Sequence, residues 1–129
     1  MPVVGKQKAL LIQCALPIEA KAVAARLSRS RKGSLGLFRA WEGQFGGVPV
    51  LVVASGMGVS EAGIAVQEMV RMFEPCGIID FGTAGALSES WPIGQCALVE
   101  RAYAYETPVV IPASPPPQPP PIAETASFG

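Results

Sequence analysis

The sequence contains no histidine and carries no excess charge of either sign, and these two absences exclude several classes of function. Its 129 residues include ten basic and ten acidic side chains, for a formal net charge of zero. A protein that grips a nucleic-acid backbone or an anionic membrane surface uses a basic excess, so we expect neither partner. Without an imidazole, Ser-His-Asp and Cys-His catalysis and most catalytic zinc sites are excluded.

Cysteine is also scarce, and its spacing is unlike that of a metal or redox site. Cys14, Cys76 and Cys96 lie far apart and form no C-x-x-C pair. We therefore predict buried free thiols, no metal, and a cytoplasmic location. The longest uncharged stretch, residues 43–60, is broken by glycines and a proline. It does not predict a membrane-spanning helix.

Short apolar runs that alternate with amphipathic stretches indicate an α/β sheet protein. Residues 9–14 form an apolar run typical of a buried parallel strand, and Gln13 interrupts it in a way that a secretion signal would not. A helix is predicted next, because Pro17 suits a first helical position and Glu19 suits a first turn. Its expected inner face comprises Ile18, Ala22 and Ala25, and its expected far end carries Arg26, Arg29 and Arg31.

The rest of the chain continues this alternation as far as a proline-rich end. Strands are predicted at residues 35–41 and 48–54 with a hairpin connection at 43–47, a helix at 59–73, and strands at 77–81 and 95–103. The expected inner face of the second helix comprises Val59, Ala62, Val66, Met69, Val70 and Phe73. Eight of the thirteen prolines lie in residues 108–121, which favours an extended conformation. We expect one α/β domain at residues 1–106 and a proline-rich tail at 107–129.

Two glycine-containing loops follow predicted strands, where α/β proteins place their sites. Ser55, Gly56 and Gly58 form the first loop, which is either a tight turn or an anion site at the start of a helix. Asp80 follows 22 residues after Gly58, as in a dinucleotide fingerprint, but Glu61 stands where that fingerprint has its third glycine.

The second loop comprises Gly82, Thr83, Ala84 and Gly85, whose backbone amides and one hydroxyl could approach a ligand closely. A plain turn is the alternative. Glu19 would face the same edge of the sheet. It is either a carboxylate that complements the helix dipole or a general base that takes a proton from water.

Taken in order, these segments resemble the amino-terminal half of the nucleoside phosphorylase family. The similarity covers about residues 9–105 and is greatest to the methylthioadenosine/S-adenosylhomocysteine nucleosidases. It is carried by Cys-Ala-Leu-Pro-Ile-Glu-Ala at 14–20, Ser-Gly-Met-Gly at 55–58, Ile-Ile-Asp-Phe-Gly-Thr-Ala-Gly-Ala-Leu at 78–87, and Pro-Ile-Gly-Gln at 92–95. The resemblance implies a three-layer mixed sheet of the nucleoside phosphorylase type, truncated here to its amino-terminal half.

The resemblance also implies roles for particular residues. Glu19 matches the family's glutamate that activates the attacking water, and Thr83 matches a residue that helps hold the nucleophile. Ala84 and Gly85, with Ala15 and Leu16, match the lining of the ribose and base. Cleavage of an N-ribosyl bond passes through a cationic sugar, so a carboxylate suits this chemistry. The family's ribose-gripping Met-Glu pair and its base-protonating aspartate lie in the carboxyl-terminal half, which this chain does not match.

The function expected from the resemblance is adenine release from a small purine nucleoside, without a cofactor and within a homo-oligomer. A phosphorylase that uses phosphate in place of water is one alternative. A non-catalytic nucleoside-binding or oligomerisation module is another, and it would cover exposed apolar surface by self-association. A dinucleotide-binding fragment is the third.

Overall fold

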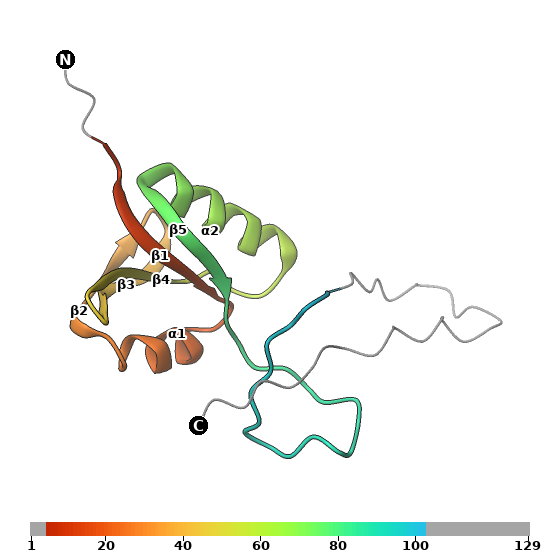
Figure 1. Cartoon of the computed structure of the whole chain (residues 1–129). Coiled ribbons are helices and arrows are strands. Elements are labelled where there is room, and N and C mark those ends of the chain that lie inside the picture. Colours follow the sequence, from red (N-terminus) through yellow and green to blue (C-terminus); the bar gives the residue numbers. More distant parts are fainter. Residues whose placement is uncertain (1–4, 103–129) are drawn as a thin grey trace. The chain divides into compact units, whose positions relative to one another are not determined.

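A computed structural model describes residues 5–102 of the chain, which divide into two compact units that meet between Ala84 and Gly85. The described part of the first unit contains all the helices and strands of Figure 1. In chain order they are β1 (Gln7–Cys14), α1 (Pro17–Ala24), β2 (Ser28–Leu35), β3 (Phe38–Phe45), β4 (Val48–Ala54), α2 (Val59–Met72) and β5 (Phe73–Asp80).

The strands form one mixed sheet in the order β2-β3-β4-β1-β5. β1 lies between β4 and β5 and is parallel to both, whereas β3 is antiparallel to β2 and β4. The register places Ile12 opposite Val52 of β4 and Ile79 of β5. The α/β class and the mixed sheet are therefore as predicted.

The two helices cover opposite faces of this sheet, as Figure 1 shows, and produce three layers. Successive side chains of a strand point to opposite faces, so each buried strand serves both cores. On the α2 face the buried cluster comprises Ala9, Leu11, Leu35, Ala40, Leu51, Val53, Ala65 and Met69. On the α1 face it comprises Ile12, Cys14, Ala20, Ala24, Trp41, Val50, Val52 and Ala54. The apolar runs of β1 and β4 reflect this two-sided burial.

The first helix is shorter than predicted and uses a different face. It ends at Ala24, and both Arg29 and Arg31 belong to β2, so only Arg26 lies near its carboxyl end. Ile18 is 73% exposed, and the buried alanines are Ala20 and Ala24. The predicted inner face was wrong because a two-turn helix with many alanines has little amphipathic pattern, so packing against the sheet decides which alanines are buried.

The predicted strand at residues 35–41 was also wrong, because a turn at Gly36 and Leu37 divides it between β2 and β3. Gly36 has a φ of +58°, which glycine adopts at little cost. Residues 43–45 belong to β3, and the β3–β4 turn is confined to Gly46 and Gly47, with φ values of +56° and +80°. The β4 prediction at 48–54 was confirmed.

The second helix was predicted to within one residue of its end. Ala65 and Met69 are its buried residues, and Ala65 was not among the predicted set. Val59, the first residue of α2, was predicted on the inner face but is 88% exposed. β5 is longer than predicted and lies at an edge of the sheet, where both Ile78 and Ile79 remain partly exposed.

The second unit is described only from Gly85 to residue 102, and within that range it forms turns without a helix or strand. The strand predicted at 95–103 is therefore absent from its described portion, residues 95–102. Leu98 and Val99 are 68% and 60% exposed, as expected for a segment without a strand partner to hold its backbone hydrogen bonds. The proline-rich tail and the domain boundary at 106 lie outside the described residues and stay predictions.

The prediction of buried thiols holds for one cysteine of the three. Cys14 is buried, whereas Cys76 and Cys96 are exposed. Cys76 lies on edge strand β5 and Cys96 in the second unit, so neither has the two covered faces that Cys14 has on β1.

Candidate functional site

The carboxyl ends of β1, β4 and β5 are tied together by backbone hydrogen bonds. Ser55 N donates to Cys14 O at 2.8 Å, and Phe81 N donates to Gln13 O at 2.9 Å. Gly56 N donates to Ala15 O at 2.8 Å. Both glycine loops are thereby fixed to the end of β1, which also leads into α1.

Glu19 lies at the centre of this edge, and both of its carboxylate oxygens accept hydrogen bonds. Oε2 accepts from the backbone N–H of Leu16 at 3.0 Å, which caps the first turn of α1. Oε1 accepts from the backbone N–H of Thr83 at 3.0 Å and from its hydroxyl Oγ1 at 2.9 Å. One side chain therefore joins the start of α1 to the loop after β5, 64 residues further along the chain.

These donors make Glu19 a stable anion. Hydrogen bonds from the Thr83 and Leu16 amides lower the pKa of the Glu19 carboxyl, and its burial opposes that effect. The residue is only 7% exposed. The Ala15 amide also lowers the pKa of this carboxyl. Glu19 is therefore held in its ionised, proton-accepting form at this edge of the sheet.

The loop passes close to the carboxylate at Gly82. A Cβ on Gly82 would lie 3.3 Å from Glu19 Oε1 and 3.4 Å from its Oε2. At that spacing a larger residue fits only if the carboxylate or the loop shifts by a few tenths of an ångström, and such a shift would disturb the hydrogen bonds from Thr83.

A buried polar pair supports the first glycine loop, and the sequence reasoning did not identify it. Gln13 Nε2 donates to Ser55 Oγ at 2.6 Å, and both side chains are buried. Ser55 Oγ in turn donates to Gly56 O at 2.8 Å. The Gln13 amide in an otherwise apolar strand could have indicated this pair, because a buried amide needs a hydrogen-bond partner.

Gly56 and Gly58 have φ values of +85° and +115°, so the loop backbone needs glycine at both positions. At the start of α2, Glu61 Oε2 lies 2.6 Å from where a Cβ on Gly58 would be. A carboxylate therefore already occupies the space beside this helix start. This placement disfavours the pyrophosphate of a dinucleotide there.

Cys14 borders the site but is inert. Burial raises the pKa of its thiol to about 12, and the negative charges of Glu19 and Asp80 contribute to the rise. A neutral buried thiol is neither a nucleophile nor a metal ligand. Within residues 5–102, no group of three Cys, Asp or Glu side chains is placed to hold a metal ion.

The structure thus brings together most of the predicted residues in the first unit. Glu19 contacts Leu16 and Thr83 directly, Gly82 lies against its carboxylate, and Ala15, Ser55 and Gly56 form the adjoining connections. Gly58 is the N-cap of α2, and Ala84 follows Thr83 at the end of the first unit. Gly85 belongs to the second unit, and its role stays a prediction.

These features define an α/β protein whose candidate site is a hydrogen-bonded carboxylate at the carboxyl edge of a mixed sheet. The Phosphorylase superfamily matches residues 9–127. This chain belongs to that superfamily. A methylthioadenosine/S-adenosylhomocysteine nucleosidase from Halalkalibacterium halodurans is 26% identical over 84 residues, which are 65% of this chain and 36% of that protein.

Solved structures give the same relationship. An S-adenosylhomocysteine nucleosidase from Streptococcus pyogenes, in complex with 5-methylthiotubericidin, is 27% identical with a TM-score of 0.60. The match covers 72% of this chain and 39% of that protein. A methylthioadenosine/S-adenosylhomocysteine nucleosidase from Neisseria meningitidis, in complex with methylthio-immucillin-A, is 25% identical with a TM-score of 0.61. The match covers 67% of this chain and 38% of that protein. The chain therefore spans less than two fifths of the length of these relatives.

Neither described helix is long and apolar enough to cross a membrane.

Proposed function

We propose that this chain forms the water-activating half of a purine nucleoside N-ribosyl hydrolase that releases adenine from methylthioadenosine or S-adenosylhomocysteine. The observation that carries the proposal is the Glu19 carboxylate, held as an ion by hydrogen bonds from Leu16 and Thr83 at the carboxyl edge of the sheet. The nucleosidases named above, among which two are bound to nucleoside analogues, support the substrate class.

In the proposed reaction a water molecule donates a hydrogen bond to Glu19 and attacks the anomeric carbon. The new C–O bond forms as the C–N bond breaks, the electron pair of that bond leaves with the purine, and the water proton passes to Glu19. The ionised carboxylate also stabilises the positive charge that develops on the sugar. The resemblance assigns protonation of the purine to an aspartate in the family's carboxyl-terminal half, which this chain does not match.

The charge of the site favours water over phosphate as the nucleophile. Glu19 is held in its ionised form, and its charge and that of Asp80 both act on Cys14. A phosphate dianion placed beside these carboxylates would be repelled, whereas a neutral water is not. Hydrolysis is therefore the form of N-ribosyl cleavage that we propose.

The test is adenine release by the full 129-residue chain, measured by chromatography with methylthioadenosine and with S-adenosylhomocysteine. Glu19→Gln should reduce release by at least ~100-fold, the usual scale for loss of a general base. Glu74→Gln is the matched control, because Glu74 is an exposed carboxylate at the opposite end of β5 and pairs only loosely with Lys8, at 3.9 Å. Added phosphate should not change the rate or convert the sugar product to a phosphate ester.

Equal rates for wild type and Glu19→Gln would overturn the assigned role of Glu19. No adenine after long incubation at high protein concentration would rule out catalysis by this chain alone. A phosphate-dependent rate would favour the phosphorylase alternative.

A second candidate function, a self-associating nucleoside-binding module, is favoured by the edge strand. Ile78 and Ile79 of β5 and Phe81 just after it are 49%, 44% and 45% exposed. Sedimentation velocity on the 129-residue chain tests it, with Ile79→Lys as the disrupting variant. A concentration-independent monomer would contradict this candidate and the expected homo-oligomer.

A further inference from the structure

A cavity of about 320 Å³ lies at the amino ends of β1 and β4, at the opposite edge of the sheet from Glu19. β1 separates the two edges by seven residue steps, from Gln7 to Cys14, or roughly 20 Å at the usual rise of a strand. The cavity volume is near the lower end of the ~300–1,000 Å³ typical of small-molecule sites. It is therefore a separate place in the molecule from the candidate active site.

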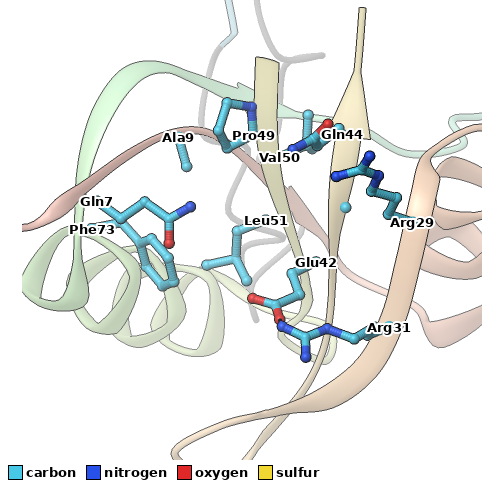
Figure 2. A pocket seen from close by; sticks show the side chains of 11 residues that line it. Gln7, Ala9, Arg29, Arg31, Glu42, Gln44, Pro49, Val50, Leu51 and Phe73 are labelled. Atoms are coloured by element: carbon cyan, nitrogen blue, oxygen red, sulfur yellow. Dashed lines mark hydrogen bonds and ion pairs between the residues drawn. The ribbon is translucent and has the colours of Figure 1, made fainter. Parts of the chain in front are cut away.

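The cavity has an apolar floor and a polar rim. Leu51 and Ala9 are buried in the floor, and Phe73 adds an aromatic ring at the start of β5. Arg29 and Arg31 of β2 and Glu42 of β3 project from the other side, as Figure 2 shows. Such a combination fits a ligand with an apolar body and one charged group.

An extra residue in β2 turns Arg29 toward the cavity. Ser28 pairs with Gln44 and Arg31 pairs with Glu42, so three steps along β2 face two steps along β3. This is a β-bulge, a feature that redirects side chains near binding sites. Arg29 has a φ of +53° and is the one non-glycine residue with positive φ among residues 5–102. Backbone strain of this kind concentrates at functional sites.

Gly43 of β3 makes room for the bulge. A Cβ on Gly43 would lie 2.9 Å from the Ser28 carbonyl oxygen and 2.9 Å from Leu27 Cβ. The absence of a side chain at Gly43 lets the start of β2 close over β3 and carry Arg29 to the cavity rim.

The charges of the rim leave one positive group available. Arg31 forms an ion pair with Glu42, which cancels both charges locally. Arg29 has no ion pair or side-chain hydrogen bond with any other residue in the 5–102 range. In Figure 2 its guanidinium extends toward Gln44, and the amides of Gln44 and Gln7 add neutral polar groups to the rim.

We propose that this cavity binds a small organic carboxylate, with its carboxylate on the Arg29 guanidinium and its apolar body on the floor formed by Leu51 and Phe73. The planar fork of arginine matches a carboxylate with two parallel hydrogen bonds. A single net positive charge suits a monoanion. Glu42 disfavours a more highly charged anion, because its carboxylate lies on the same rim.

The experiment is a titration of the full 129-residue chain, labelled with ¹⁵N, followed by the amide signals of Gln7, Gln44 and Leu51. Benzoate is the probe, benzyl alcohol is the same apolar body without the charge, and inorganic phosphate is an anion without the apolar body. Benzoate should shift these signals saturably. Benzyl alcohol and phosphate should each bind at least about tenfold more weakly than benzoate. Benzyl alcohol lacks the carboxylate, and phosphate lacks the apolar body.

Arg29→Gln should weaken benzoate binding by about tenfold or more, the usual scale for loss of a charge-assisted bond. Arg26→Gln is the matched control, since it removes the same charge from an exposed position that does not line the cavity. Arg29→Gly gives a second variant that also removes the side chain and tolerates positive φ, should Arg29→Gln fold poorly.

Three outcomes would overturn the proposal: no saturable shift with benzoate, equal affinity for benzoate and phosphate, or unchanged benzoate affinity in both Arg29 variants. None of these measurements depends on adenine release, so the proposal and the proposed function succeed or fail separately.

Discussion

At the carboxyl ends of β1 and β5 a carboxylate lies among hydrogen-bond donors that match it. The cavity at the amino ends of the same strands instead carries an arginine on a strained bulge of β2, and that arginine has no side-chain partner within residues 5–102. Glu19 accepts three hydrogen bonds, from Leu16 and Thr83. Arg29 has a φ of +53° and belongs to a cavity rim. The key side chains of the two edges thus have opposite charges. Glu19 has hydrogen-bond partners for both of its oxygens, whereas Arg29 has no side-chain partner within residues 5–102.

The difference shows that the two edges of one sheet can be built differently, one with matched hydrogen bonds and the other with a strained backbone. At the carboxyl edge, helix α1 begins and the loop after β5 passes, so backbone amides converge on one point and favour an anion. At the amino edge, the antiparallel hairpin of β2 and β3 meets the parallel strands, and a bulge adjusts the mismatch. The first edge stabilises the fold, and the second stores strain.

The largest expected change in stability comes from Gly43→Ala, which places a side chain where β3 packs against the β2 bulge. Its new Cβ would meet the Ser28 carbonyl oxygen at 2.9 Å, and forced overpacking of this kind costs ~1–3 kcal/mol. Chemical denaturation should show that loss. Gly33→Ala in β2 is the control, because nothing lies within 4 Å of its Cβ position. Equal stability of the two variants would mean that the bulge is free to move.

A smaller effect of opposite sign is expected from Arg29→Gly. Glycine adopts positive φ without the clash of a Cβ, so relief of the strain should raise the free energy of unfolding by about 1 kcal/mol. Arg39→Gly is the matched change in β3 and lies at an ordinary strand position. It should instead lower stability by ~0.5–1 kcal/mol. Denaturation curves that show a loss for both variants would contradict the strained state of Arg29.

The smallest effect is a pH dependence confined to the carboxyl edge. The pKa of Glu19 is lowered from its ordinary value of 4.5 in the folded protein. Its contribution to stability is therefore present above the unfolded-state pKa and is lost as pH falls through the folded-state pKa. The stability advantage of wild type over Glu19→Gln should shrink as pH falls below about 5.

Urea denaturation between pH 6 and pH 3 measures this advantage. Glu74→Gln removes a carboxylate at the other end of β5 and is the control. An advantage of wild type over Glu19→Gln that grew as pH fell would contradict a lowered pKa for Glu19.

Much of the fold could be predicted from local pattern. The apolar runs at 9–14 and 48–54 marked β1 and β4 because central strands bury both faces. The periodic face at 62–70 marked α2. The predictions failed where the pattern was weak. These places were the alanine-rich α1, the turn at Gly36 inside an apparent strand, and the exposed segment at 95–102.

The candidate site was predictable as a set of residues but not as a geometry. Glu19 and Thr83 were identified from their places after strands and from their motifs. The sequence did not reveal that both Glu19 oxygens would be occupied, or that Gln13 would support Ser55 from within β1. The Arg29 bulge was missed altogether, since the basic residues there were attributed to the end of α1.

By itself, the sequence determined the class of this protein and its superfamily, because hydrophobic period and short motifs are properties of neighbouring residues. The tertiary structure alone decided which groups meet across long separations, as when Thr83 reaches Glu19 from 64 residues away. It also decided that Arg29 faces a cavity. That outcome depends on how β2 pairs with β3, and strand pairing is settled only when both strands have found their places in the sheet.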